Sequence, residues 1–391
     1  MALNTVSSDR LSTNVKNTNF TAAEKQDLTD DILPLATQFG QSKNLIINGA
    51  MQVAQRGTSS TSTGLLIDRV EVEYTGLDEA ATVAQVDVAS GTTPYTLGFR
   101  KAYKITNGNQ TSGAGAGDRF QSFIKLEAQN IANSGWNYTS SSSYITLQFW
   151  IKSSVAQNFY GYLRTKDGTG QRYAFETGSL TADTWTKITK TIPGNANLTF
   201  NNDNGEGLQI NLQHFSGTDF TDSGVSLNAW GAYASGTRTP DQTSTWYTTN
   251  NSTLEYTGFQ LELGSVATDF EHRSFDVERD LCRRYFQRFN FTAANTCLGS
   301  GYIESSTEFR IPFQFFKEMR DAPTFAVSSA AAFDAANGNQ SRTASNIAIS
   351  NATAMGCILI ATTGSGLNTS TNAGIFRNTS APQHFDFSSE L

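Results

Sequence analysis

Most catalytic and metal sites are built from histidine, cysteine and paired carboxylates. This sequence has three histidines and three cysteines: His214, His272, His384, Cys282, Cys297 and Cys357. The histidines lie far apart, with no HExxH motif. The cysteines are odd in number and widely spaced, which fits neither a disulfide framework nor a zinc site and favours reduced, mostly buried thiols. These residues could still form a Ser/His/Asp or Cys/His catalytic site if the folded chain brings them together, which their spacing in the sequence does not decide.

Enzyme signatures are missing elsewhere in the chain as well. The acidic residues are scattered, whereas an enzyme that cuts polysaccharide needs two carboxylates about 5 to 10 Å apart in a groove. The sequence has no GxSxG elbow or Walker loop, and the glycines of residues 113–117 have the wrong spacing for a dinucleotide fingerprint. Residues 202–206 carry oxygen ligands that suit calcium but lack the full loop pattern, which leaves a structural calcium open. We predict no catalytic residue, no cofactor and no catalytic metal.

Aromatic residues in polar loops are the remaining candidates for binding chemistry. An exposed ring stacks on the apolar face of a sugar while nearby amides bind its hydroxyls, but the same rings also serve core packing or subunit contacts. Three Trp and Tyr pairs lie in segments rich in Gly, Ser, Thr and Asn: Trp136 with Tyr138, Trp230 with Tyr233, and Trp246 with Tyr247. We treat these six residues as glycan or interface candidates.

The charge pattern excludes several classes of partner. Only 16% of the 391 residues are charged, and 28 Lys and Arg against 35 Asp and Glu give a net charge of −7. No dense basic run is present, so nucleic acid is not an expected partner. No apolar run approaches the roughly 20 residues of a membrane span, and the polar start lacks a secretory signal. We expect synthesis in a cytoplasm without export or membrane insertion.

Residues 44–275 show the alternation of an antiparallel β-sandwich. Three segments alternate apolar and polar residues: 145–152, 208–213 and 259–263. Each is expected to have one buried and one wet face, so that Gln260 and Glu262 would face solvent or a neighbouring subunit. Turn signals such as Asp167-Gly168 and Pro193-Gly194 separate the segments. The fold class that follows is mainly β, a two-sheet jelly-roll sandwich.

Residues 276–391 change to a helical period before β signals return. Asp276 can cap a helix in which Val277, Leu281, Tyr285 and Phe289 form an apolar stripe. On its opposite face, with Glu278 among its charges, Asp280 and Arg284 have the spacing of an ion pair. Strand signals follow in five segments, 309–316, 324–327, 346–350, 356–360 and 384–387. These features predict a linker helix followed by a small antiparallel β domain.

Residues 1–43 form a third region, which is polar and poor in aromatics. Residues 21–24 have capping-box spacing, and Pro34 interrupts the helical pattern that follows. Its apolar residues are too few to fold alone, so we predict a partly helical docking arm that orders on a partner or on copies of itself. The oligomer or docking candidates in this arm are Leu28, Ile32, Leu35 and Phe39.

Four blocks, in this order, resemble virion proteins of tailed bacteriophages, particularly tail fibres. They are NLIINGAMQVAQRG at 44–57, GFQLELG with ATDFEHR at 258–273, LCRRYF at 281–286 and MRDAPT at 319–324. The resemblance covers most of residues 44–330. The middle sandwich is also similar to the jelly-roll carbohydrate-binding modules that accompany glycosidases.

These resemblances imply a non-enzymatic structural protein of a phage particle. The expected form is a trimeric tail fibre that joins other phage tail or capsid proteins through residues 1–43 and contacts a host-surface glycan through its distal β domains. The same sequence features leave open a capsid decoration or head-fibre protein and, less favoured, a polysaccharide-degrading tailspike. The implied location is the virion.

Overall fold

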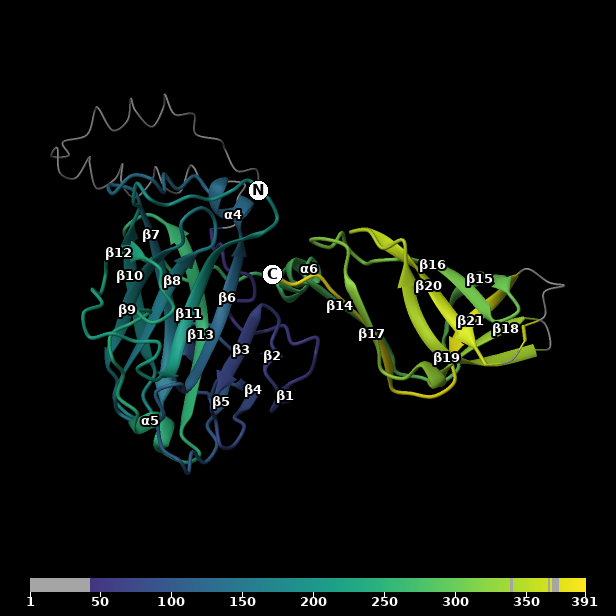
Figure 1. Cartoon of the computed structure of the whole chain (residues 1–391), viewed down its shortest axis with the longest axis horizontal. Coiled ribbons are helices and arrows are strands. Elements are labelled where there is room, and N and C mark those ends of the chain that lie inside the picture. Colours follow the sequence, from purple (N-terminus) through teal and green to yellow (C-terminus); the bar gives the residue numbers. More distant parts are fainter. Residues whose placement is uncertain (1–42, 338–339, 365, 368–372) are drawn as a thin grey trace, which may run out of the picture. The chain divides into compact units, whose positions relative to one another are not determined.

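The computed structural model describes residues 43–337, 340–364, 366–367 and 373–391 (Figure 1). Residues 44–391 form one compact unit, separate from residues 1–43. The predicted arm, apart from Lys43, lies outside the described residues. So do its docking candidates, Leu28, Ile32, Leu35 and Phe39. The arm, the trimer and the division at residue 275 stay predictions.

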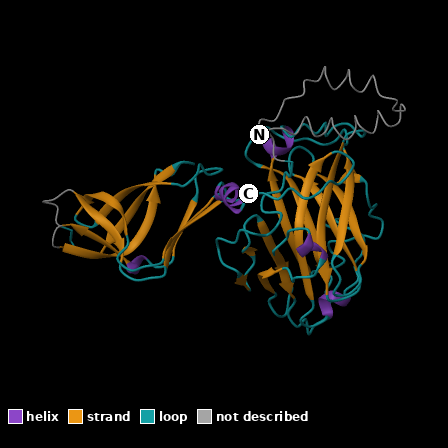
Figure 2. Cartoon of the chain, turned by 180° about the vertical axis from the view of Figure 1, so that it is seen from behind, coloured by secondary structure: helices purple, strands orange, loops and turns teal. Residues whose placement is uncertain are grey.

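The first part of the unit is an antiparallel β-sandwich, as predicted (Figure 2). One sheet has six strands in the order β1 (Ser59–Ser60), β4 (Thr82–Asp87), β5 (Lys101–Thr106), β13 (Thr253–Leu263), β7 (Tyr144–Ser153) and β10 (Thr186–Pro193). The other has seven, in the order β12 (Trp230–Ala232), β9 (Gln171–Ser179), β8 (Asn158–Thr165), β11 (Glu206–Ser216), β6 (Arg119–Glu127), β3 (Val70–Thr75) and β2 (Gly64–Leu65). The mainly β fold class is therefore confirmed.

Alternate residues of both sheets fill the core between them. In β7, Ile145, Leu147, Phe149 and Ile151 are at most 1% exposed, as the alternation predicts. Facing them across the core are the apolar residues of β11: Leu208, Ile210 and Leu212. His214 of β11 also lies in this core, hydrogen-bonded to Ser122 and Tyr256.

The prediction of one wet face is wrong for the central strands, because loops cover their outer faces. In β13, Gln260 and Glu262 are fully buried. The chain that leaves β13 folds back over them: Thr268 donates its backbone N–H to the Glu262 carboxylate at 2.9 Å, and Glu271 donates to the Gln260 side chain at 2.8 Å. Buried amides and carboxylates are tolerated where such partners exist.

Helix α6 (Phe275–Arg283) is shorter than its predicted stripe. Ser274, and not Asp276, caps it by accepting from the Val277 backbone N–H. Val277 is 50% exposed, and Phe289 lies beyond the helix in a strand. The helix could not extend to Phe289, because the chain turns at this point to enter a sheet. In the part of the chain that the structure describes, three other α-helices are single turns: α3 (Thr93–Thr96), α4 (Ala128–Ala132) and α5 (Thr245–Thr248).

The buried face of α6 also differs from the prediction, since it carries Glu278 and Cys282. Glu278 lies inside because it pairs with the buried Arg273. The predicted pair between Asp280 and Arg284 does not form. Asp280 pairs with Arg283 at 2.9 Å, because Arg284 reaches a carboxylate of the sandwich.

After α6 the chain builds a three-stranded sheet and a closed barrel, which confirms a small antiparallel β domain. The sheet contains β14 (Phe286–Phe291), β22 (Gln383–Ser388) and β17 (Thr324–Val327). The barrel order is β15 (Cys297–Ser305), β16 (Glu308–Gln314), β20 (Gly356–Thr363), β19 (Gln340–Ser350), β18 (Phe333–Asn337) and β21 (Ala373–Asn378), with a 3₁₀ turn at Ala330–Ala332. Buried phenylalanines such as Phe309, Phe333, Phe376 and Phe385 form its core.

Candidate functional site

The four sequence blocks singled out above, at 44–57, 258–273, 281–286 and 319–324, meet in one place. Asn44 donates its amide to the Phe259 carbonyl at 2.9 Å and accepts from the Leu261 N–H at 3.1 Å. Gly49 lies so close to the same strand that a Cβ there would be 2.0 Å from the Phe259 carbonyl oxygen. The opening block therefore packs directly on β13, which belongs to the second block.

Arg273 ties these two blocks to α6. Its guanidinium donates to the Ile46 carbonyl at 3.1 Å and to the Asn44 carbonyl, and it pairs with Glu278 at 3.3 Å. Glu278 also accepts the Asn48 N–H. Arg273 also pairs with Glu271 at 3.1 Å. The neighbouring His272 points elsewhere, with its Nε2 2.8 Å from the Leu97 carbonyl oxygen.

The third block reaches the sandwich through Glu127, whose side chain is completely buried at the end of β6. Glu127 accepts from Arg284 Nε at 2.7 Å and Nη2 at 2.8 Å, and from the Tyr285 hydroxyl at 2.6 Å. Burial raises the pKa of Glu127, but hydrogen bonds from Arg284 and Tyr285 outweigh it and hold that pKa below its ordinary value. The carboxylate is thus kept charged.

Arg320 of the fourth block completes this region. Its guanidinium donates to the carbonyls of Asn204 at 3.1 Å, Ser389 at 2.7 Å and Glu390 at 3.0 Å. Asn204 belongs to residues 202–206, which the sequence left open as a calcium site. Its side chain donates to the Arg320 carbonyl at 2.7 Å. We call the region of residues 44–49, 127, 271–285 and 320 the joint. Its polar groups serve the fold.

A different surface has the character of a ligand site, namely the outer face of the seven-stranded sheet. Strand register places one outward row across it: Arg172, Arg164, Gln209 and Lys125. The neighbouring row contains Tyr162, Asn211 and Phe123. Most jelly-roll strands with a solvated face alternate toward small polar residues, whereas this face collects long donors and rings.

The loop of residues 217–243 folds over this face. Tyr233 of the loop lies with its ring 6.3 Å from the Tyr162 ring and 3.7 Å from the guanidinium carbon of Arg164. The Arg238 carbonyl accepts from Arg172 Nη1 at 3.3 Å. As a result Arg172 and Arg238 are each only 7% exposed, although both carry a full charge.

Beside β9 and β12, this loop leaves an open cavity of about 370 Å³. Arg172 offers guanidinium donors, Asp222 offers a carboxylate, and Ser226 and Thr237 offer hydroxyls. Trp230 also lines the cavity. Its indole Nε1 donates to the Pro193 carbonyl at 2.6 Å, which fixes the half-buried ring. Convergent polar groups beside an aromatic residue are the usual composition of a small-ligand site.

The six aromatic candidates separate into two groups. Trp136, Trp246 and Tyr247 are buried in the core, and Tyr138 packs half-buried against Phe200 at 5.0 Å between ring centres. A buried ring offers no face to a sugar, so these four serve packing in the structure. Tyr233 packs on Tyr162 and Arg164 at the outer face. Trp230 lines the cavity, but its half-buried ring lies on the core side of β12, 5.4 Å from the Tyr173 ring.

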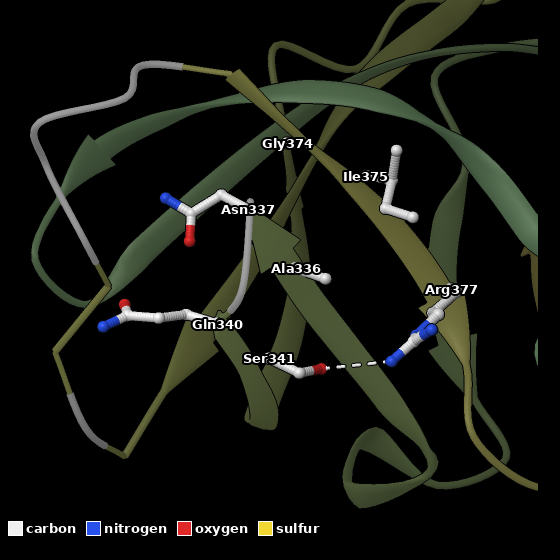
Figure 3. A pocket seen from close by; sticks show the side chains of 7 residues that line it. All are labelled: Ala336, Asn337, Gln340, Ser341, Gly374, Ile375 and Arg377. Atoms are coloured by element: carbon white, nitrogen blue, oxygen red, sulfur yellow. Dashed lines mark hydrogen bonds between the residues drawn. The ribbon is translucent and has the colours of Figure 1, made fainter.

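A second hollow of about 400 Å³ lies on the outside of the barrel (Figure 3). Small residues form its floor, because Ala336 lies between Ser341 and Ile375 in the strand register. Arg377 donates to the Ser341 hydroxyl at 3.4 Å, and Figure 3 shows this bond on one side of the hollow. The described lining has no aromatic ring and no carboxylate.

The histidines and cysteines lie on different elements of the described structure. His214 is buried, and its burial lowers its pKa to about 3, so it stays neutral in the core. The cysteines are free thiols; Cys282 and Cys357 are buried, and Cys297 is exposed. Among the described residues, no group of three or more His, Cys, Asp or Glu could hold a metal ion. Within the same residues, every helix is too short or too polar to cross a membrane.

No protein-family model matches this sequence, and no curated protein matches it. Solved structures that it resembles include a putative sugar-binding protein from Bacteroides thetaiotaomicron, at 11% identity over 56% of this chain and 100% of that chain, with a TM-score of 0.30. The N-terminal cellulose-binding domain of β-1,4-glucanase C from Cellulomonas fimi covers 55% of this chain and 99% of its own, at 11% identity and a TM-score of 0.26. A family 11 carbohydrate-binding module from Clostridium thermocellum covers 55% and 98%, at 14% and 0.23.

The sequence candidates include Trp230, which lines the cavity, and Tyr233, which covers Arg164, but none of the arginines. Arg164 and Arg172 come from two strands and become neighbours only through the register of β8 and β9. One local signal was available: Tyr160, Tyr162 and Arg164 alternate along one face of β8. Large polar side chains at three successive outward positions indicate a surface that binds something.

Proposed function

We propose that this chain is a non-enzymatic structural protein of a tailed-bacteriophage particle, a trimeric tail fibre that contacts a saccharide of the host surface. The observation that carries the binding part is the cavity beside β9 and β12, in which Arg172, Asp222 and Trp230 converge. Donors and a carboxylate acceptor together match the hydroxyls of a sugar.

The virion part is supported by the four blocks of sequence that resemble phage fibre proteins. Their residues pack together in the joint, from Asn44 through Arg273 and Arg284 to Arg320. They hold the sandwich to α6 and the strands after it. In this proposal residues 1–43 attach the fibre to the tail, and the described unit faces the host.

A blocking substitution tests the binding part. Ser226 is exposed and lines the cavity, so Ser226→Trp should fill it without disturbing the core. We expect the purified full chain to bind surface polysaccharides of its host on an array, and Ser226→Trp to lose at least ten-fold in affinity, about 1.4 kcal/mol. Ser90→Trp, at an exposed position in another loop, is the matched control and should bind as the wild type does. Equal binding by all three proteins would contradict the cavity assignment.

The particle itself tests the virion part. Antibody to this chain should label the tails of intact particles in cryo-electron micrographs, with three copies per fibre by quantitative mass spectrometry. Label confined to capsid faces would contradict the tail-fibre proposal and support a capsid-bound role.

A further inference from the structure

Three arginines at the outer face lack acidic partners, in contrast to five arginines elsewhere in the unit. Arg56, Arg69, Arg273, Arg284 and Arg288 each pair with a carboxylate within 4 Å. Among the described residues, no such pair forms for Arg164, Arg172 or Arg238. A charge buried without a partner is costly, so its presence needs a reason.

The position of Arg164 and Arg172 sharpens the problem. The two residues are directly opposite each other on β8 and β9, and their side chains point to the same face of the sheet. Like charges directly opposite in a sheet repel each other. The row continues with Gln209 and Lys125, so no carboxylate separates the charges.

Polar atoms of this group lack hydrogen-bond partners within the described chain. They are Nε of Arg164 and of Arg172, Nε and Nη1 of Arg238, and Oδ1 of Asn211. Arg238 and Arg172 are 7% exposed, and Asn211 is fully buried. Two aromatic contacts compensate in part: Arg164 packs on Tyr233 at 3.7 Å, and Arg238 on Phe220 at 4.7 Å. Neither contact neutralises the charge.

The electrostatics agree with this geometry. Burial lowers the pKa of Arg172, whereas the neighbouring Glu127 raises the pKa of Arg284 in the joint. Of the three arginines, Arg172 lines the cavity of about 370 Å³, so a ligand there would meet Arg172 directly, with Arg164 beside it on β8. Asp222 lines the same cavity, where its carboxylate accepts from the Gly224 N–H at 2.7 Å. The cavity therefore has a cationic side at Arg172 and an acceptor side at Asp222.

We propose that Arg172, with Arg164 and Arg238, binds a carboxylate carried by the saccharide, so that the ligand is an acidic glycan. The inference rests on the sugar-binding function proposed above and specifies its substrate class. A planar guanidinium binds a carboxylate through two parallel hydrogen bonds, and the added negative charge would relieve the repulsion between Arg164 and Arg172. The hydroxyl acceptor Asp222 then orients the neutral part of the sugar.

Paired probes separate this inference from the function on which it rests. Acidic bacterial surface polysaccharides are presented to the full chain in native form and after chemical reduction of their carboxylates to alcohols, beside a sulfated polysaccharide. We expect native acidic chains to bind, with affinity that falls as salt rises, and their reduced forms to lose at least ten-fold. Binding of reduced and native forms alike would overturn the inference and leave the sugar-binding function standing. Preference for the sulfated chain alone would overturn the carboxylate assignment, and binding of none would overturn both proposals.

Variants provide a second readout. Arg172→Gln should reduce binding of the native acidic form at least ten-fold and leave the reduced form unaffected. Asp222→Asn should weaken binding of the native and the reduced form by the same factor, because Asp222 is assigned to the neutral part of the sugar. Arg100→Gln is the charge-matched control, since Arg100 is exposed and packs on Tyr95 away from this face.

Thermal stability without ligand gives an outcome that a purely structural role would not produce. Because the arginine is buried without an acidic partner, Arg172→Met should melt at the wild-type temperature or above it. A strong loss of stability in Arg172→Met would show that the guanidinium serves the fold, and would contradict the ligand role.

Discussion

Replacing Glu127 with glutamine should weaken the joint between the sandwich and the strands that follow α6. Glutamine has nearly the same shape but is neutral, so it no longer attracts the Arg284 guanidinium, whose Nε and Nη2 lie 2.7 and 2.8 Å from the carboxylate oxygens. It also offers one acceptor oxygen in place of two for the bonds from Arg284 and the Tyr285 hydroxyl. Tyr285 is itself buried and has no water to replace the bond. The joint would then contain an unpaired guanidinium beside a buried amide.

The expected magnitude follows from burial. Breaking a buried ion pair by removing one partner costs about 3 to 5 kcal/mol. The side chain of Glu127 is 0% exposed, but that of Arg284 is 29% exposed and keeps some contact with water. The cost should therefore lie near the lower end, about 3 kcal/mol, which lowers the melting temperature of a unit of this size by about 4 °C.

Urea unfolding of the full chain, followed by fluorescence at pH 7, measures this cost. Glu73→Gln is the matched control: Glu73 pairs with Arg119 but is 41% exposed, so its loss should cost no more than about 1 kcal/mol. The pH dependence gives a check on sign. The folded pKa of Glu127 is lowered, so its stabilisation is present above the ordinary value of 4.5 and is lost as pH falls through the folded value. Glu127→Gln within 1 kcal/mol of wild type at pH 7 would refute the role of the joint.

Three further predictions concern the core, the joint and the thiols. His214 has a folded pKa of about 3 against an ordinary 6.5, so stability should fall by about 1.4 kcal/mol per pH unit as pH drops from 6.5 toward 3; His214→Gln should remove that slope, and equal slopes in urea titrations would contradict it. Gly49→Ala should cost about 3 kcal/mol, because its Cβ meets backbone, while Gly364→Ala, in open space, should stay within about 0.5 kcal/mol in the same urea assay. A thiol reagent should label Cys297 of the native chain, as mapped by mass spectrometry, and equally fast labelling of Cys357 would show that this thiol is not buried.

Alternation along the strands was enough to predict which residues of the sandwich face the core. The apolar positions of β7 are buried as their period requires. The outer faces were not predictable from the same pattern, because what covers them comes from elsewhere in the chain. Gln260 and Glu262 are buried only because residues 264–273 turn back and supply partners such as the Thr268 N–H. A strand pattern reports the polarity of a residue, and long-range contacts decide its exposure.

Long-range contacts limit the prediction of the candidate ligand site as well. Local composition identified Trp230 and Tyr233, but it also selected Trp246, which fills the core from a single helical turn and donates to the Thr253 carbonyl at 3.0 Å. Loops rich in Gly, Ser and Thr can fold onto a core as readily as away from it. The arginine row depends on strand register, which is set by the whole sheet and cannot be inferred from either strand alone.

A crystal structure of the full chain with an oligosaccharide of the host surface would show whether a saccharide binds in the cavity beside β9 and β12. We expect saccharide density in the cavity, with oxygen atoms within hydrogen-bond distance of Arg172 and Asp222. A saccharide bound elsewhere, for example in the barrel hollow at Ser341 and Arg377, with this cavity empty, would contradict it.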